Sequence, residues 1–252
     1  MKNSKVLYSI FLGIACIFLV YVCIDSVVTP IRFEQKRAER EVLVVKNLVN
    51  IRAAEAEYKL INGRYQGDLD SLVLFLQNTP KKEVMKEGSL TDKQLEAGLT
   101  ELKATRILEK ALAKAAAKLK IEDKDQLYAY IWENDRDVQS NGLSGFRRDT
   151  IYKNMIETLY KGEYTAENID QITYIPYTNK LRFETEVNND YTTSQGIKVP
   201  LIEVRAHYNT YLADLDNQER VNLIDKETKL EHYPGLKIGS IEAPNNNAGN
   251  WE

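Results

Sequence analysis

The stretch AEYKLINGRYQGDLDSLVLFL, residues 56–76, predicts a long helix that ends at a turn and folds back as a second, shorter helix. Asn62 and Gly63 tolerate the left-handed backbone conformation that closes many helices. Asp68 is a favourable N-cap because its carboxylate can accept hydrogen bonds from the first free N–H groups of a helix. Four apolar residues after it share one face, which we expect to pack on the preceding helix: Leu69, Leu72, Val73 and Leu76.

The preceding segment carries an apolar stripe whose members recur every three or four residues, as on one face of an α-helix. Between positions 32 and 41 the charges alternate in sign and Phe33 is almost the only apolar residue, which predicts a solvated helical neck. We therefore expect residues 30–80 to form a helical stalk and a short packing helix. The stripe consists of Val44, Leu48, Ile51, Ala54, Tyr58 and Ile61.

Residues 6–28, VLYSIFLGIACIFLVYVCIDSVV, form an apolar run whose only charged residue is Asp25. At about 1.5 Å per residue, such a helix can cross a hydrocarbon core of about 30 Å. We expect an uncleaved transmembrane anchor over residues 1–29. The alternatives are a cleaved signal peptide, for which no cleavage site is evident, and a lipoprotein processed at Cys16, although the apolar run continues to Val22.

The orientation of the anchor depends on the basic residues that flank it. Lys2 and Lys5 precede the apolar run, whereas Arg32, Arg40 and two other basic residues follow it, which by count alone favours a cytoplasmic body. A short lysine-bearing N-terminus before a long body is, however, typical of an exported signal-anchor protein. We expect a single-pass inner-membrane protein with a periplasmic body, and a cytoplasmic body is the alternative.

Composition and charge exclude several function classes. The 252 residues are 43% hydrophobic and 28% charged, which is typical of a folded protein. The net charge of -3 argues against nucleic-acid binding, which needs an excess of clustered Lys and Arg. Cys16 and Cys23 both lie in the apolar run, and the two histidines, His207 and His232, are too few for most zinc sites. We predict no metal and no cofactor.

The first third of the chain resembles a known family. A membrane helix with a proline near its outer end, an amphipathic extension and the turn GRYQGDLDSL at residues 63–72 are similar to the N-terminal region of type IV pilins and type II secretion pseudopilins. The resemblance covers residues 6–76. The Gly-Phe processing site and the early acidic residue of prepilins are missing, since Asp25 lies near the far end of the run. The resemblance implies a pilin-like envelope component rather than a pilin proper.

The remaining sequence predicts two further regions. Thr91 and Gln94 form a capping-box pattern at the start of a helix extending to about Leu119, with Leu95, Leu99 and Leu102 on one face. A second helix is expected over residues 125–138, so residues 81–140 form a helical region. The turn-rich segment 137–145, DVQSNGLSG, predicts a boundary, after which we expect an α+β domain over residues 141–252.

That domain is expected to contain one helix and a small, mostly antiparallel sheet. The helix is predicted over residues 150–162, and short β-branched or aromatic runs separated by turn residues predict the strands. The predicted fold class is therefore α+β, with a transmembrane helix that continues into a long amphipathic helix. The predicted strands are QITYIPY at 171–177, KLRFETEV at 180–187, KVPLIEVRAHY at 198–208 and LKIGSIEA at 236–243.

Two features are candidate interaction sites. The adjacent Arg147, Arg148 and Asp149 could bind an anion or a partner's carboxylate, or could belong to a surface loop in which Asp149 caps the next helix. The terminal segment APNNNAGNWE, residues 243–252, is loop-like, but burying the Trp251 ring would contribute about 2–3 kcal/mol. We expect Trp251 to dock on its own sheet or on a partner.

No catalytic motif is present in the sequence. We expect a non-catalytic, membrane-anchored structural or interaction component of a bacterial envelope assembly, pilin-like or secretion-apparatus-like. Its partners would be the lipid bilayer and either other envelope proteins or a second copy bound through the stalk. A membrane-tethered ligand-binding or sensory domain is the alternative, for which we expect a pocket of a few hundred Å³ in the sheet domain. A tethered hydrolase is the third hypothesis.

Overall fold

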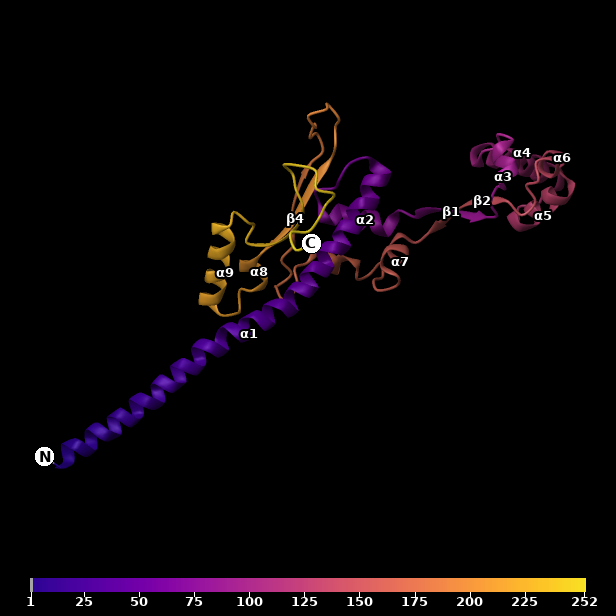
Figure 1. The fold of residues 1–252 in the computed structure, drawn as a ribbon. Helices are drawn as coiled ribbons and strands as arrows, with labels where there is room; N and C mark the ends of the chain where they lie inside the picture. Colours follow the sequence, from indigo (N-terminus) through magenta and orange to yellow (C-terminus); the bar gives the residue numbers. More distant parts are fainter. Residues whose placement is uncertain (1) are drawn as a thin grey trace. The chain divides into compact units, whose positions relative to one another are not determined.

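A computed structural model describes residues 2–252, with side chains from Phe11 onward, and shows an α+β fold (Figure 1). The chain forms two compact units. We call Met1–Thr79 together with Ile156–Glu252 the stalk unit, and Pro80–Met155 the inserted unit. The stalk unit is therefore discontinuous in sequence. The expected boundary near residue 141 instead lies inside the inserted unit.

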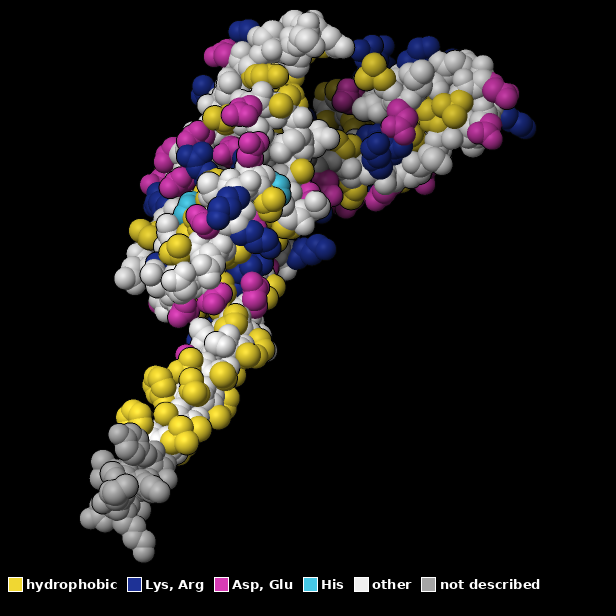
Figure 2. Space-filling model, turned by 60° about the vertical axis from the view of Figure 1, so that its left-hand side comes forward, with side chains coloured by type: hydrophobic (Ala, Val, Ile, Leu, Met, Phe, Trp, Pro, Cys, Tyr) yellow, Lys and Arg dark blue, Asp and Glu magenta, His cyan; other side chains and the backbone are white. Residues whose placement is uncertain are grey.

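Helix α1, Lys2–Asn62, continues through Pro30 without a break in the helix assignment. Its first part is long and apolar enough to be a candidate membrane span, and none of that apolar window is buried against the protein. Figure 2 shows hydrophobic side chains covering the helix between its first residues and the charged body. The candidate membrane span and the stalk are thus parts of one continuous helix.

The predicted turn and packing helix are present. Gly63 adopts a φ of 73° and its N–H donates to the Lys59 carbonyl at 2.8 Å. Asp68 caps helix α2, Leu69–Asn78, and accepts from the Asp70 and Ser71 N–H groups. The predicted apolar face of α2 is buried, and Phe75 also meets Tyr58 edge-to-face at 4.9 Å between centroids. The turn therefore folds α2 back onto the stalk.

The predicted stripe on α1 forms the core of the stalk unit, because Val44, Leu48, Ile51 and Ala54 are fully buried. Ile61 is exposed, so the buried stripe ends before the helix does. The prediction of a solvated neck over residues 32–41 is wrong at two positions. Phe33 and Arg40 are buried, because segments distant in sequence cover this part of α1.

Arg40 is held by the chain between α8, Tyr208–Tyr211, and α9, Asn217–Lys229. Its guanidinium donates to the Tyr211 carbonyl at 2.7 Å and to the Asp214 carboxylate at 2.8 Å, and it lies 4.6 Å from the centre of the Tyr177 ring. This charged hydrogen bond lowers the pKa of Asp214 to about 2. The segment between α8 and α9 thus contributes a structural ion pair.

The sheet is three-stranded and antiparallel, with the order β3 (Glu184–Asn188), β4 (Leu201–His207) and β5 (Gly235–Gly239). Val204, Ala206 and Ile238 are buried with the stalk core. The opposite face carries an ion-pair network in which Arg205 meets Glu184 and two other carboxylates. Alternation of apolar and charged residues along β4 therefore fixes which face meets the core.

Two predictions for the segments before the sheet are wrong. Residues 171–177 do not form a strand: η1, Ile169–Thr173, covers the first part of this segment as a 3₁₀ helix whose Ile169 and Ile172 are buried, and Tyr174 forms only an isolated bridge to Arg182. The single helix expected over residues 150–162 is instead the end of a strand followed by α7, Met155–Tyr160. Both segments are short and apolar, a pattern that does not distinguish a strand from a buried helical turn.

The inserted unit is a helical cluster on a two-stranded ribbon. Strand β1, Lys81–Glu87, pairs antiparallel with β2, Arg147–Lys153. Between them lie α3 (Asp92–Glu96), α4 (Glu101–Leu119), α5 (Lys124–Asn134) and α6 (Arg136–Ser140). The predicted capping box at Thr91 and Gln94 is present, but the helix it opens ends at Glu96, and Gly98 just after it has a φ of 78°.

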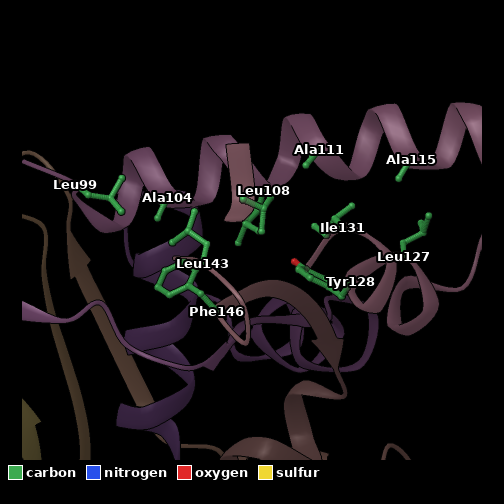
Figure 3. Close-up of a cluster of buried hydrophobic side chains, with 11 residues drawn as sticks. Leu99, Ala104, Leu108, Ala111, Ala115, Leu127, Tyr128, Ile131, Leu143 and Phe146 are labelled. Atoms are coloured by element: carbon green, nitrogen blue, oxygen red, sulfur yellow. The ribbon is translucent and has the colours of Figure 1, made fainter. Parts of the chain in front are cut away.

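The core of the inserted unit explains the remaining differences from the sequence prediction. Figure 3 shows Leu108, Ala111 and Ala115 of α4 facing Leu127 and Ile131 of α5. Residues 137–145 turn within this unit and contribute Val138 and Leu143 to the same core, so they are not a linker. Leu99 is buried, whereas Leu95 and Leu102 are exposed, because the break at Gly98 ends their common helical register.

Two of the leucines of α2 test the stalk core. Leu72 is fully buried, whereas Leu74 on the same helix is 57% exposed. We expect Leu72→Ala to lower the free energy of unfolding by about 2–5 kcal/mol, because it leaves a cavity. Leu74→Ala is the matched control and should cost far less. Equal losses in chemical unfolding experiments would show that α2 is not docked on α1.

Glu55 predicts a pH-dependent stability. This residue of α1 is 1% exposed, and its carboxyl accepts the Gln66 N–H at 3.0 Å. Burial raises the pKa of Glu55 to about 8. In the unfolded chain the Glu55 carboxyl has a pKa of about 4.3, so it releases its proton at a lower pH than in the folded chain. Stability should therefore fall as pH rises from about 5 to 8.

Replacing Glu55 by Gln keeps the acceptor but removes the titration. We expect Glu55→Gln to unfold at a higher temperature than the wild type at pH 8 and to show a smaller advantage at pH 5. Glu39→Gln, at an exposed position of the same helix, is the control. Parallel pH profiles for the wild type and Glu55→Gln would contradict the assignment.

Candidate functional site: an exposed apolar face on the stalk helix

A second apolar stripe lies on α1, separate from the one that forms the core. Its members are apolar residues, several of them small, spaced three or four positions apart, so they share one side of the helix. Sequence reasoning identified only the buried stripe. The spacing of the second was readable in the sequence, but spacing does not tell which of two stripes will be covered. The stripe consists of Ala38, Val42, Val45, Val49, Ala53, Ala56 and Leu60.

The two ends of this face are open to solvent in the folded chain, whereas Val45, Val49 and Ala53 at its centre are half-buried. Val42 is 67% exposed and Leu60 is 78% exposed, and Ala38 and Ala56 are also exposed. Single exposed apolar residues are common on protein surfaces and need no explanation. A row of them along one side of a helix is different, because it offers a continuous surface that another helix can cover. We call this row the open stripe.

The open stripe continues the surface of the candidate membrane span. Toward the N-terminus, the same face of α1 continues with apolar residues at a spacing of three or four. These are Ile31, Val27, Ile24 and Val20, each of which is more than half exposed. Gln35 is the one polar step between Ile31 and Ala38. Because α1 is a single helix, the two surfaces keep one register. A helix bound along the open stripe would therefore follow α1 toward the membrane.

The residue sizes along the open stripe suit close packing of helices. Alanine at positions 38, 53 and 56 leaves little side chain between two backbones, and small residues favour close helix contacts at membrane interfaces. The valines at 42, 45 and 49 add stiff apolar side chains that lose little conformational entropy on burial. The arrangement favours binding of a helix over binding of a small molecule.

Arg147, Arg148 and Asp149 lie in β2, not in a loop before a helix. Arg147 pairs with Asp125 at 2.7 Å, and Asp149 pairs with Lys124 at 2.6 Å. These three β2 side chains are mostly covered. Their charges tie the ribbon to α5.

Arg148 connects the ribbon to α4 by an ion pair in the same way. Its guanidinium pairs with Glu101 at 3.1 Å, donates to the Glu87 carbonyl at 2.8 Å and lies 4.0 Å from the centre of the Phe146 ring. Adjacent positions on a strand point to opposite sides, which explains how neighbouring arginines reach two different helices. Both guanidinium groups are thus engaged inside the inserted unit.

Trp251 lies on a C-terminal tail that is docked on its own chain. Gly249 bridges to Ile238 of β5, and the Asn250 side chain both accepts from the Lys237 N–H at 3.0 Å and donates to the Gly235 carbonyl at 2.9 Å. The indole of Trp251 is half-buried. Asparagine side chains therefore help to hold this segment on the sheet.

The tail is also tied to α1. Arg52 pairs with Glu252 at 2.7 Å, and Asn247 donates to the Tyr65 hydroxyl at 2.8 Å. The tail therefore joins the stalk helix, the turn after it and the sheet.

No group of three His, Cys, Asp or Glu side chains within the described part of the chain is placed to hold a metal ion. Comparison with protein-family models, curated proteins and solved structures finds no match to this chain. The candidate site therefore rests on the geometry of α1 alone.

The tail contacts predict a loss of stability when the tail is removed. Deleting residues 245–252 removes the bridge to β5, the Arg52 pair and the half-buried indole. We expect the purified protein to melt several degrees lower, corresponding to about 2 kcal/mol or more. Glu242→Gln, at an exposed position just before the tail, should leave the melting temperature unchanged. An unchanged melting temperature after the deletion would show that the tail is loose in solution.

Proposed function

We propose that this protein is a membrane-anchored structural or interaction component of a bacterial envelope assembly, built in a pilin-like way. The observation that carries the proposal is the open stripe, an exposed apolar face that continues the surface of the candidate membrane span. In this proposal the span crosses the inner membrane, the body lies in the periplasm, and the stripe binds a neighbouring helix.

The energetics favour an occupied stripe. Covering one exposed valine or leucine side chain contributes about 1.5–3 kcal/mol. A neighbouring helix covering several of them would gain enough to offset the entropy lost on association, and a partner in the same membrane has already lost part of its translational freedom. Left uncovered, such a face promotes non-specific association.

The construction of the stalk unit supports the pilin-like reading. One helix provides the candidate membrane span, and its second half packs against a short helix and an antiparallel sheet. The core stripe and the open stripe lie on different sides of that half, so the folded body leaves the open stripe available. The inserted unit would then be a separate module carried by the stalk unit.

The alternative, a membrane-tethered ligand-binding or sensory domain, is favoured by one observation: the sheet domain contains a groove of several hundred Å³. Such a groove is compatible with an assembly component as well.

The proposal predicts site-specific crosslinking along the open stripe. A photo-crosslinking phenylalanine analogue at position 42 should give a discrete adduct in native membranes, because a helix lies against this face. The same analogue at position 36, an exposed polar site on another side of α1, is the control and should give little or none. An adduct of twice the monomer mass would identify a second copy, and another mass a different partner. Equal yields at both positions, or no adduct at either, would overturn the proposal.

A further inference from the structure

A groove of about 470 Å³ lies in the stalk unit between α1, the end of α9, β5 and the C-terminal tail. Its lining includes Arg37 and Glu41 from α1, Tyr208 from α8, Glu231 from the turn after α9, Tyr233 and Trp251. A volume of this size is in the range of small-ligand and side-chain sites. The open stripe is a different surface, so the following inference is independent of the proposed function.

Three aromatic side chains line the groove. Burial raises the pKa of Tyr208 and of Tyr233 to about 12, so both hydroxyls stay neutral near pH 7. The tail contacts described above place the indole of Trp251 here. The Lys237 ammonium already lies 5.8 Å from the centre of the Tyr233 ring, which shows that this ring accepts a cation on one side. Aromatic faces with this negative potential attract positive charge.

The positive charges of the groove are engaged by the chain itself. Arg37 pairs with Glu34 at 2.9 Å and approaches Glu41 at 3.2 Å. Lys237 pairs with Glu203 at 2.9 Å. These contacts leave the groove with no cation available for an anionic ligand among its described lining residues.

The negative groups of the groove are less completely paired. The exposed carboxylate of Glu231 has no hydrogen-bond or ion-pair partner among the described residues. Glu227 pairs only with His232, at 3.1 Å, which is an ion pair only when that imidazole is protonated. The groove therefore presents hydrogen-bond acceptors and negative charge beside aromatic faces.

Glu41 provides a half-buried carboxylate at the wall of the groove. One oxygen of Glu41 is buried and lies 3.2 Å from the Arg37 Nε. Burial raises the pKa of Glu41, while hydrogen bonding from the Arg37 guanidinium and the Tyr211 hydroxyl lowers it in part. Burial raises the pKa of Tyr211, and the nearby charge of Glu41 raises it further. A buried carboxylate is stabilised by each further charged donor, so a cation that reaches Glu41 from the groove would add to these contacts.

We infer that this groove binds a cationic amine or guanidinium group, presented as a basic side chain of a peptide. Aromatic faces and carboxylates together recognise such a group, because the rings attract its charge while the carboxylates accept its N–H hydrogens. An anion would meet Glu41, Glu227 and Glu231 without a free cation. A purely apolar ligand would leave these carboxylates desolvated and unpaired.

The fluorescence of Trp251 provides the test. The chain contains two tryptophans, and Trp132 belongs to the inserted unit, so Trp132→Phe leaves Trp251 as the sole indole. The full chain in a non-ionic polyoxyethylene detergent is titrated with acetyl-Gly-Arg-Gly-amide. We expect a saturable change in Trp251 emission with a dissociation constant of about 1 mM or tighter. The matched acetyl-Gly-Gln-Gly-amide should give no saturable change.

Charge-removing variants locate the binding. Glu231→Gln, at an exposed position that should not affect folding, is expected to weaken the arginine peptide several-fold. The double variant Glu41→Gln and Glu231→Gln should weaken it at least about tenfold, provided that its melting curve remains cooperative. Glu242→Gln, outside the groove, is the control and should bind like the parent.

Three results would overturn the inference. One is the absence of a saturable response to the arginine peptide, and another is an equal response to the glutamine peptide. The third is a saturable response to a neutral oligosaccharide such as chitotriose that the glutamic acid variants leave unchanged, which would assign the groove to an uncharged ligand.

Discussion

The stalk unit depends on the packing of one face of α1 against α2 and the sheet. Leu48 and Ile51 are fully buried at the centre of this contact. Because a helix carries its residues in one fixed register, burying this face also determines where every other residue of α1 points. The open stripe, the Arg40 ion pair and the direction of the candidate membrane span all follow from that single constraint.

The end of α1 shows how polar groups are accommodated beside this core. The Tyr65 N–H donates to the Asn189 side chain at 3.0 Å, and the buried Glu55 accepts the N–H of the next residue, Gln66. Asn247 of the tail reaches the Tyr65 hydroxyl. Buried backbone groups need such partners, so the turn, the sheet and the tail stabilise one another through short-range hydrogen bonds.

The inserted unit is also held together by an apolar core with ion pairs around it. Arg147 and Arg148, at adjacent positions of β2, form ion pairs with residues of α5 and α4, respectively. Only the β1–β2 ribbon leads into it from the rest of the chain. A module connected in this way can vary without disturbing the stalk core, and this suits an insertion that carries a separate surface.

Local patterns by themselves determined the long helices, the cap at Asp68, the α1 stripe and three of the strands, because periodicity and capping act over a few residues. They did not determine that β1 pairs with β2, that Phe33 and Arg40 are covered, or that Trp251 lies beside α1. Those contacts join residues sixty or more positions apart. Only the tertiary structure decides which of two apolar stripes is buried, since both have the same helical spacing and differ only in what packs against them.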